Sequence, residues 1–305
     1  MNRNTLHALK DIVPVRTSKA VAGVILQNMA KVIRGGKRSY YSVKYRNVKP
    51  FRNPTDEELV LIEENLIRSG VKVLDYTVCP DAFHHFQQSF HFPSDYHRDV
   101  KDEKLLEHYI SFDLLGLRNY PEGDRYLDVA ACGSPWAWLL RENRSIQAYA
   151  IDLNVPEGFL HMDYYLQMDA TRTTFPDSSI KGMSLQCAFE MFLRDDDIYF
   201  IREANRILAK GGKIIIVPLY LHTHYCSYST PDCWGKGFSD SDGEEYIRMD
   251  SWNIPSSRKY DPSRLRSRIL RTVEELGMHH RIHVLRNKGD LGSNIYCHFI
   301  LEVEK

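Results

Sequence analysis

The sequence lacks the features that would place the chain across a membrane or in a disulfide-stabilised fold. Its 305 residues contain no apolar run that approaches the roughly 18–20 residues needed to span a bilayer. The first residues show neither an uninterrupted apolar core nor a small-residue cleavage site, so we expect no secretory signal. No two of the six cysteines form a Cys-x-x-Cys pair, which is typical of reduced thiols rather than of a zinc ribbon or a disulfide framework. We therefore expect a cytoplasmic protein.

Net charge is absent as well, because 40 basic side chains balance 40 acidic ones. The balance is uneven along the chain: residues 1–52 hold twelve basic side chains and a single acid, Asp11. Apolar residues recur at helical spacing from Val21 to Ile33 and predict a helix whose stripe is buried on the core or on a second subunit. A homo-oligomer and peripheral contact with an anionic membrane surface both stay open. We do not expect nucleic acid as a partner, because no RNA-binding module is present.

Strands and helices alternate from Arg125 onward, and this alternation sets the expected fold class. Seven short apolar segments predict strands, at residues 126–130, 147–151, 164–168, 181–187, 213–218, 281–286 and 295–303. We predict an α/β fold with a Rossmann-like, seven-stranded, mostly parallel sheet and helices on both faces. Residues 1–120 are expected to form a basic, helical cap or lid region. Residues 121–305 are expected to form the main domain, with an insertion at about 219–262.

Candidate ligand-binding residues follow the predicted strands, because ligands bind beyond the carboxyl ends of strands in such sheets. The first strand carries Asp128 and runs into a turn of small residues, Ala130 to Ser134. Asp152 ends the second strand, 19 residues after Gly133, a spacing typical of an acid that binds ribose hydroxyls. The third strand is followed by Asp169 and Ala170, and the fourth ends at Gln186.

The order of these features resembles class I S-adenosylmethionine-dependent methyltransferases over about residues 121–220. Besides the strand ends, residues 175–180 are similar to the family's linker, and residues 202–212 to its helix and glycine turn. The turn departs from the pattern, since the family usually has glycine where this chain has Ala130, Cys132 and Ser134. The resemblance implies S-adenosyl-L-methionine as cofactor. The residues it implies for binding that cofactor are Asp128, Ala130, Gly133, Asp152, Asp169, Ala170 and Gln186.

Three residues are candidates for the proton transfer that a hydroxyl acceptor needs. His97 lies where the N-terminal region would cap the pocket, and His222 lies just beyond a strand. Glu190 follows the fourth strand and is the carboxylate candidate. For each of these residues, an ordinary packing or surface role is the alternative. We expect no metal, because His222 and His224 are expected to point to opposite sides of an extended segment and no tight acidic cluster is present.

The acceptor is indicated only by resemblance. Residues 102–108 and 258–261 resemble methyltransferases associated with bacterial surface polysaccharide and glycan synthesis. We therefore expect O-methylation of a sugar or glycan hydroxyl. The alternatives are a small-molecule or natural-product N- or O-methyltransferase, an RNA or protein methyltransferase, and a non-catalytic module that binds S-adenosylmethionine.

Overall fold

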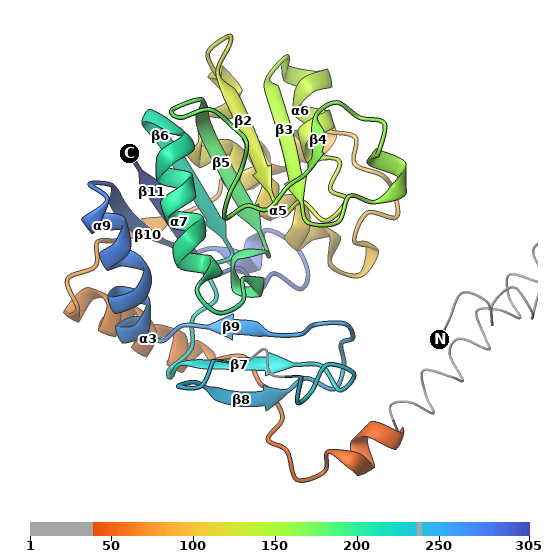
Figure 1. Cartoon of the computed structure of the whole chain (residues 1–305), viewed down its shortest axis with the longest axis vertical. Helices are drawn as coiled ribbons and strands as arrows, with labels where there is room; N and C mark the ends of the chain where they lie inside the picture. The colour runs from red at the N-terminus through yellow and green to blue at the C-terminus, as the bar shows by residue number, and fades with distance from the viewer. Residues whose placement is uncertain (1–38, 237–239) are drawn as a thin grey trace, which may run out of the picture.

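A mostly parallel sheet of eight strands organises the fold, as a computed structural model that describes residues 39–236 and 240–305 shows (Figure 1). The strand order is β1-β10-β11-β6-β5-β2-β3-β4. All neighbours pair in parallel except those of β11, which is antiparallel to both β10 and β6. The strands are β1 (Val73–Tyr76), β2 (Arg125–Val129), β3 (Gln147–Asp152), β4 (Tyr165–Gln167), β5 (Ile180–Gln186), β6 (Leu208–Val217), β10 (His279–Leu285) and β11 (Phe299–Glu304).

The predicted α/β class and mostly parallel sheet are confirmed, but the predicted number of seven strands is wrong. The extra strand is β1, whose residues Val73 to Tyr76 pair in parallel with Ile282 to Leu285 at one edge of the sheet. Its four residues are too few to show the period-two pattern that indicates a strand. The N-terminal region therefore contributes an edge strand, and the boundary predicted after residue 120 stays a prediction.

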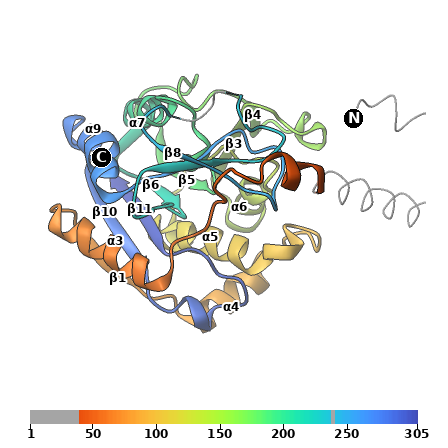
Figure 2. The same cartoon turned by 90° about the horizontal axis from the view of Figure 1, so that it is seen from below.

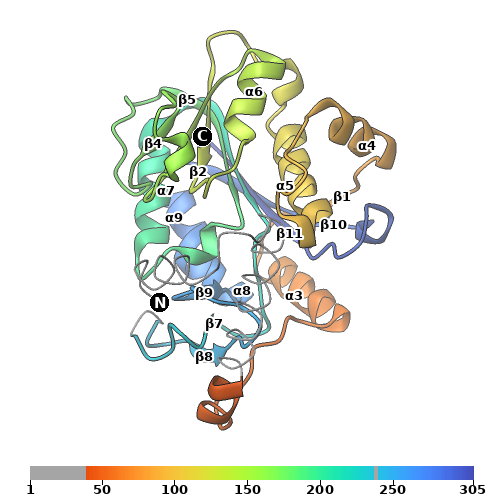
Figure 3. The same cartoon turned by 90° about the vertical axis from the view of Figure 1, so that its right-hand side faces the viewer.

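Helices cover both faces of the sheet, and the alternation of side chains along β6 shows why. Ile214 and Ile216 pack into one apolar cluster with α3, α7 and α9, whereas Ile215 and Val217 pack into a second cluster with α4, α5 and α6 (Figure 3). The helices are α3 (Asp56–Arg68), α4 (Pro80–Ser89), α5 (Lys101–Leu114), α6 (Trp136–Arg144), α7 (Asp196–Ile207), α8 (Pro262–Leu265) and α9 (Arg271–Glu275), with a π-helical turn at Arg266–Leu270 between the last two.

The start of α3 shows how the sequence sets a helix boundary. The Thr55 hydroxyl accepts a hydrogen bond from the Glu58 N–H, and the Glu58 carboxylate accepts one from the Thr55 N–H. This capping box satisfies two donors that would otherwise be unpaired. Short 3₁₀ turns occur at Arg98–Val100, Leu117–Asn119, Glu157–Phe159, Phe189–Met191 and Lys288–Asp290.

The predicted insertion contains a small sheet that lies beyond the carboxyl ends of the main strands (Figures 1 and 2). Its strands are β7 (Cys226–Ser229), β8 (Glu244–Ile247) and β9 (Ser257–Lys259), in the order β8-β7-β9. The helical stripe predicted from Val21 to Ile33 lies outside the described residues. Within residues 39–236 and 240–305, no helix has both the length and the apolar character required to cross a membrane.

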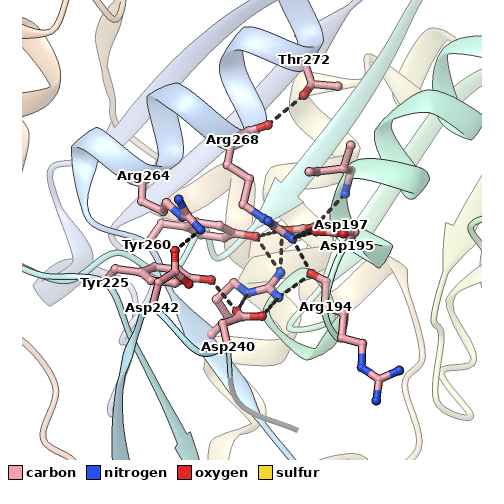
Figure 4. Close-up of polar contacts among 12 residues, drawn as sticks. Arg194, Asp195, Asp197, Tyr225, Asp240, Asp242, Tyr260, Arg264, Arg268 and Thr272 are labelled. Carbon is pink, nitrogen blue, oxygen red and sulfur yellow. Dashed lines mark hydrogen bonds and ion pairs between the residues drawn. The ribbon is translucent and has the colours of Figure 1, made fainter.

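Buried ion pairs fasten the insertion to the core, as Figure 4 shows. The Asp197 carboxylate, at the start of α7, is completely buried and accepts hydrogen bonds from Arg258 in β9 and from the Tyr260 hydroxyl. Arg268 donates to the same carboxylate from its Nε at 2.8 Å, and Asp240 accepts from the Arg258 Nε at 2.8 Å. Every charge in this cluster has a partner of opposite sign, so the cluster holds the small sheet in a fixed position over the strand ends.

Candidate active site

The turn after β2 is held in a conformation that side chains rarely adopt. Ala130, Cys132 and Gly133 have positive φ angles of 55°, 48° and 79°. Such left-handed conformations suit glycine. This explains why related enzymes usually have glycine at the two positions that Ala130 and Cys132 occupy here. A Cβ on Gly133 would lie 3.3 Å from the Pro156 Cγ, so this position has little room for a side chain.

Hydrogen bonds from neighbouring strands brace the same turn. The Cys132 N–H donates to the Asp152 carboxylate at 2.8 Å, and the Gly133 N–H donates to the Tyr165 hydroxyl at 2.7 Å. The Ser134 hydroxyl accepts from the Trp136 N–H at 3.1 Å and so ties the end of the turn to the first residue of α6. The predicted acid Asp152 is thus close to the predicted turn, and it fixes the turn in the absence of the usual glycines.

Asp128 is the most unusual charged residue of this region. Its side chain is completely buried, and neither carboxylate oxygen has a hydrogen-bond partner. Burial raises the pKa of Asp128 to about 8. The nearby Ser134 hydroxyl lowers this pKa but does not offset the effect of burial. A buried carboxylate with so few donors is costly, and a ligand ammonium or N–H would stabilise it. This requirement fits the amino group of S-adenosylmethionine.

The other predicted cofactor residues differ in how free they are to bind a ligand. Asp169 is held by Thr171, whose N–H and hydroxyl donate to it at 2.9 and 2.7 Å, while Ala170 is half-buried beside it. Gln186 directs its amide toward α5, because it donates to Ser184 at 2.7 Å and to Ser111 at 3.2 Å. Each binding role assigned from the sequence stays a prediction.

Aromatic rings from the N-terminal region cover the start of α6, next to the turn. The Phe92 ring stacks on Trp136 with centroids 5.9 Å apart, and His108 lies 5.0 Å from the same indole. The Tyr96 hydroxyl bonds the His108 Nε2 at 2.8 Å. These contacts place residues 92–96 beside the turn, where a cap over a bound cofactor would lie.

A cavity of about 500 Å³ opens between the main sheet and the small sheet. Its walls come from the segments after β5 and β6, the start of α3, the small sheet and the segment before β11. The lining mixes apolar side chains with charged and hydroxyl side chains, which include Glu190, Tyr220, Tyr228, Arg248, Lys259, Lys288 and Tyr296. The volume is within the range of small-molecule sites.

Glu190 and Lys259 are two buried groups of opposite charge that line this cavity and interact electrostatically. Burial raises the pKa of Glu190, and the charge of Lys259 counteracts that rise. Burial lowers the pKa of Lys259 to about 8, against the opposing effect of Glu190. The Lys259 ammonium also lies 3.6 Å from the centroid of the Tyr220 ring and 3.1 Å from the Ser257 hydroxyl. One Glu190 oxygen has no hydrogen-bond partner and is therefore free to accept a proton.

The structure separates the three catalytic candidates. Glu190 lines the cavity, whereas His97 is exposed and ends the segment before α5 in a left-handed conformation with φ of 43°. His222 is buried next to the cavity wall but does not line it. His222 and His224 do not point to opposite sides of the chain, contrary to what was expected from the sequence. Their ring centroids lie 4.5 Å apart, since residues two apart on an extended segment share a face and the chain bends between them.

A polar cluster that was not predicted from the sequence lies where α5 meets the end of β5. The Lys104 ammonium contacts both Glu107 oxygens at 3.0 Å, and the Cys187 thiol donates to Glu107 at 3.2 Å. The Tyr220 hydroxyl lies 3.1 Å from the Cys187 sulfur. A signal was present, because Lys104 and Glu107 are three residues apart on a helix and form an ion pair there. Their burial follows from packing that the sequence pattern does not show.

The parallel sheet, the small-residue turn and the acids at successive strand ends together define a class I methyltransferase fold. Residues 127–216 match the family described as "Methyltransferase domain". The chain therefore carries a class I S-adenosylmethionine-dependent methyltransferase domain, and the predicted enzyme class and cofactor are confirmed. No curated protein matches the chain.

Three solved structures illustrate the fold. The 1,6-didemethyltoxoflavin-N1-methyltransferase of Burkholderia thailandensis, solved with 1,6-didemethyltoxoflavin and S-adenosylhomocysteine, is 12% identical; the match covers 85% of this chain and 94% of that one, with a TM-score of 0.45. A Haloferax volcanii complex of the Trm112 methyltransferase activator with a methyltransferase is 16% identical. The match covers 68% of this chain and 94% of that one, with a TM-score of 0.40. The YcgJ protein of Bacillus subtilis matches at 14% identity, 65% and 99% coverage and a TM-score of 0.41. Likenesses this distant say nothing about the acceptor.

Proposed function

We propose that the enzyme methylates a hydroxyl group of a small polar acceptor, namely a sugar or the terminal sugar of a glycan. The observation that supports this proposal is the cavity of about 500 Å³ at the carboxyl ends of β5 and β6. Its hydroxyl and charged side chains can hydrogen-bond a ring that carries several hydroxyls, and Tyr220 and Tyr228 offer flat surfaces to the ring.

S-adenosylmethionine supplies an electrophilic methyl group on a positively charged sulfur. The turn after β2 and the acids Asp128 and Asp152 would hold this cofactor, with Ala130 and Gly133 leaving space beside the backbone. Much of the rate of such a transfer comes from holding the acceptor oxygen in line with the methyl group. The enzyme's own contribution is thus a cavity that fixes the acceptor.

Glu190 is the proposed general base. It lines the cavity, has an unpartnered oxygen and a pKa raised by burial, and this combination suits a general base. The proton of the acceptor hydroxyl would pass to the Glu190 carboxylate as the oxygen attacks the methyl group. Before the reaction, the positive charge of Lys259 would stabilise the ionised Glu190 carboxylate.

The cations of the cavity favour an acceptor that also carries a negative group. Arg248, Lys259 and Lys288 line the cavity, against the two acids Asp56 and Glu190. Asp56 accepts from Lys288 at 2.8 Å, so this pair is already matched. Arg248 is also paired, through its Nε with Asp250 at 2.9 Å, but its guanidinium has further N–H donors. These donors and Lys259 can bind a carboxylate or phosphate, as in a sugar acid or a nucleotide sugar.

A methyl-transfer assay with labelled S-adenosylmethionine tests the proposal across nucleotide sugars, glycans, RNA, proteins and a metabolite extract. We expect labelling of a sugar-containing acceptor, and a loss of kcat of about 10²–10⁴-fold in Glu190→Gln. The control Glu142→Gln changes an exposed acid on α6 and should leave the rate unchanged. Labelling of RNA or protein alone would reject the proposed acceptor, and cofactor binding without turnover on any pool would favour the non-catalytic alternative.

We also propose a cellular compartment for the protein and a role for its basic N-terminal segment. All six cysteines are unpaired, which supports a reducing compartment such as the cytoplasm.

We propose that the apolar stripe from Val21 to Ile33 packs on the core or on a second copy of the chain. Deletion of residues 1–36 should then reduce stability or change the oligomeric state even at high salt, because apolar burial is not screened. Unchanged stability with loss of salt-sensitive binding to anionic vesicles would instead support membrane contact.

A further inference from the structure

Three potential metal ligands meet where the chain passes from β6 into the small sheet. They are His222, His224 and Cys226, and their ligand atoms all lie within 4.8 Å of one another. His222 is 3% exposed and Cys226 is 1% exposed, whereas His224 is half-buried, so water can reach the group from one side. Within residues 39–236 and 240–305, this is the one group of three or more His, Cys, Asp or Glu side chains placed closely enough to hold an ion.

The two imidazoles are oriented toward a common point. The Nδ1 atoms of His222 and His224 lie 3.2 and 3.3 Å from the same Thr223 hydroxyl. That hydroxyl has a single proton, so it can donate to only one of the two nitrogens. The ring centroids are 4.5 Å apart at an interplanar angle of 77°. When both rings carry their proton on Nε2, both Nδ1 atoms are acceptors, and one of them therefore has no hydrogen-bond donor at Thr223.

An outer hydrogen bond favours that arrangement for His224. Its Nε2 lies 2.8 Å from the Tyr246 hydroxyl, which in turn donates to the Glu244 carboxylate at 2.9 Å. A Tyr246 hydroxyl that donates to Glu244 can accept from the His224 Nε2–H, which leaves Nδ1 as a lone-pair donor. Metal-binding histidines commonly have such an outer partner that ends in a carboxylate.

We propose that His222, His224 and Cys226 bind a zinc ion, with a water molecule as the fourth ligand. Nitrogen and thiolate ligands in tetrahedral geometry are the preferred set of Zn²⁺. Bond lengths of about 2.0–2.3 Å require ligand atoms about 3.3–3.6 Å apart, so the three side chains need to move inward by no more than about 1 Å. The ion forms bonds to two imidazole nitrogens and to sulfur, and the Cys226 thiol releases its proton to solvent.

The site would fix the wall of the acceptor cavity without taking part in methyl transfer. Leu221 and Tyr228, which line the cavity, flank the three ligands in the sequence. Phe51 packs on Tyr228 with centroids 4.5 Å apart and on His222 at 6.3 Å. A bound ion would therefore hold together the chain leaving β6, the first residues of β7 and the segment that precedes α3.

Titration of the metal-free full chain with Zn²⁺ alone, against a chromophoric competitor, tests the site. We expect one ion per chain and a dissociation constant at least 100-fold weaker in Cys226→Ser. The control Cys233→Ser removes a partly buried thiol of the same insertion, outside the cluster, and should bind as the unaltered chain does. Replacing Zn²⁺ by Co²⁺ should give a thiolate-to-metal absorption band that Cys226→Ser lacks.

A second variant guards against a folding defect. His224 is only half-buried, so His224→Gln should fold, and it should weaken Zn²⁺ binding at least 10-fold while S-adenosylmethionine still binds. No stoichiometric binding by the unaltered chain would overturn the site, and so would equal affinities in Cys226→Ser and Cys233→Ser. Neither result depends on methyl transfer, so the outcome is independent of the proposed acceptor.

Discussion

The contact between the insertion and the core differs from the cofactor turn in the number of partners that a buried carboxylate has. Where the insertion meets the core, Asp197 of α7 is completely buried and contacts Arg258, Arg268 and Tyr260. At the turn, Asp128 is equally buried, yet neither of its oxygens has a partner. The comparison teaches that a satisfied buried charge serves the fold, whereas an unsatisfied one indicates where a ligand belongs.

Breaking the satisfied cluster should have the largest effect. Asp197→Asn leaves Arg258 and Arg268 without the carboxylate they share, and we expect a loss of about 3–5 kcal/mol in the free energy of unfolding. Urea denaturation measures this loss. The control Asp195→Asn removes an exposed partner of Arg268 and should cost about 1 kcal/mol or less. Equal losses in the two variants would show that burial does not distinguish these carboxylates.

Removing the unsatisfied charge should change the pH dependence of stability. The pKa of Asp128 is about 8 in the folded chain, against an ordinary value of 3.8. Between these values the folded state holds a proton that the unfolded chain has released, so the free energy of unfolding should fall as the pH rises from 4 to 8.

Asp128→Asn should remove roughly 2–4 kcal/mol of that fall. Denaturation at a series of pH values measures the slope, with the exposed Asp163→Asn as control. Saturating S-adenosylmethionine should flatten the slope of the unaltered chain, because its amino group would pair with the carboxylate. An unchanged slope in Asp128→Asn would contradict the assignment of the buried charge.

Asp152 belongs to both sides of the comparison, because it stabilises the turn and is also expected to bind the cofactor. Its carboxylate accepts from the Cys132 N–H and from the Asn154 N–H, and we also expect it to bind the ribose hydroxyls. Asp152→Ala should weaken S-adenosylmethionine binding by roughly 1.5–3 kcal/mol. Calorimetry measures the change. A loss of stability with unaltered affinity would leave Asp152 as a brace alone.

The smallest expected effect concerns strain in the turn. Cys132 has a φ of 48°, and glycine adopts this conformation without the steric cost that a side chain incurs. Cys132→Gly should therefore raise the free energy of unfolding by about 0.5–1 kcal/mol, after the greater entropy of unfolded glycine is deducted. Cys79→Gly, at a φ of −71°, is the matched control and should not stabilise the chain. Destabilisation by Cys132→Gly would show that the thiol makes contacts that outweigh the strain.

The sequence was sufficient to predict the elements whose signal is local. The strands from Arg125 onward follow from residue type and spacing, and the structure has them at nearly the predicted positions. The edge strand β1 was missed because its four residues carry too little pattern and depend on β10, about 200 residues away, for their hydrogen bonds.

The cavity was harder to predict because distant segments build it. Glu190 could be proposed from its place after a strand, but Lys259 and Tyr296 reach the cavity only through the fold of the insertion and of the C-terminal segment. The fully buried state of Asp128 was likewise invisible in the sequence, since it depends on the packing around β2 rather than on its neighbours along the chain. Burial and pairing, which decide the chemistry of these charges, are properties of the tertiary structure.

The most direct test of this account is calorimetric titration of the unaltered chain and of Asp128→Asn with S-adenosylmethionine and, separately, with NAD. The unaltered chain should bind S-adenosylmethionine with a clear heat and give none with NAD, and Asp128→Asn should bind S-adenosylmethionine at least 10-fold more weakly. A heat with NAD alone, or equal S-adenosylmethionine affinity in the two chains, would contradict the claim that the unsatisfied carboxylate marks the cofactor site.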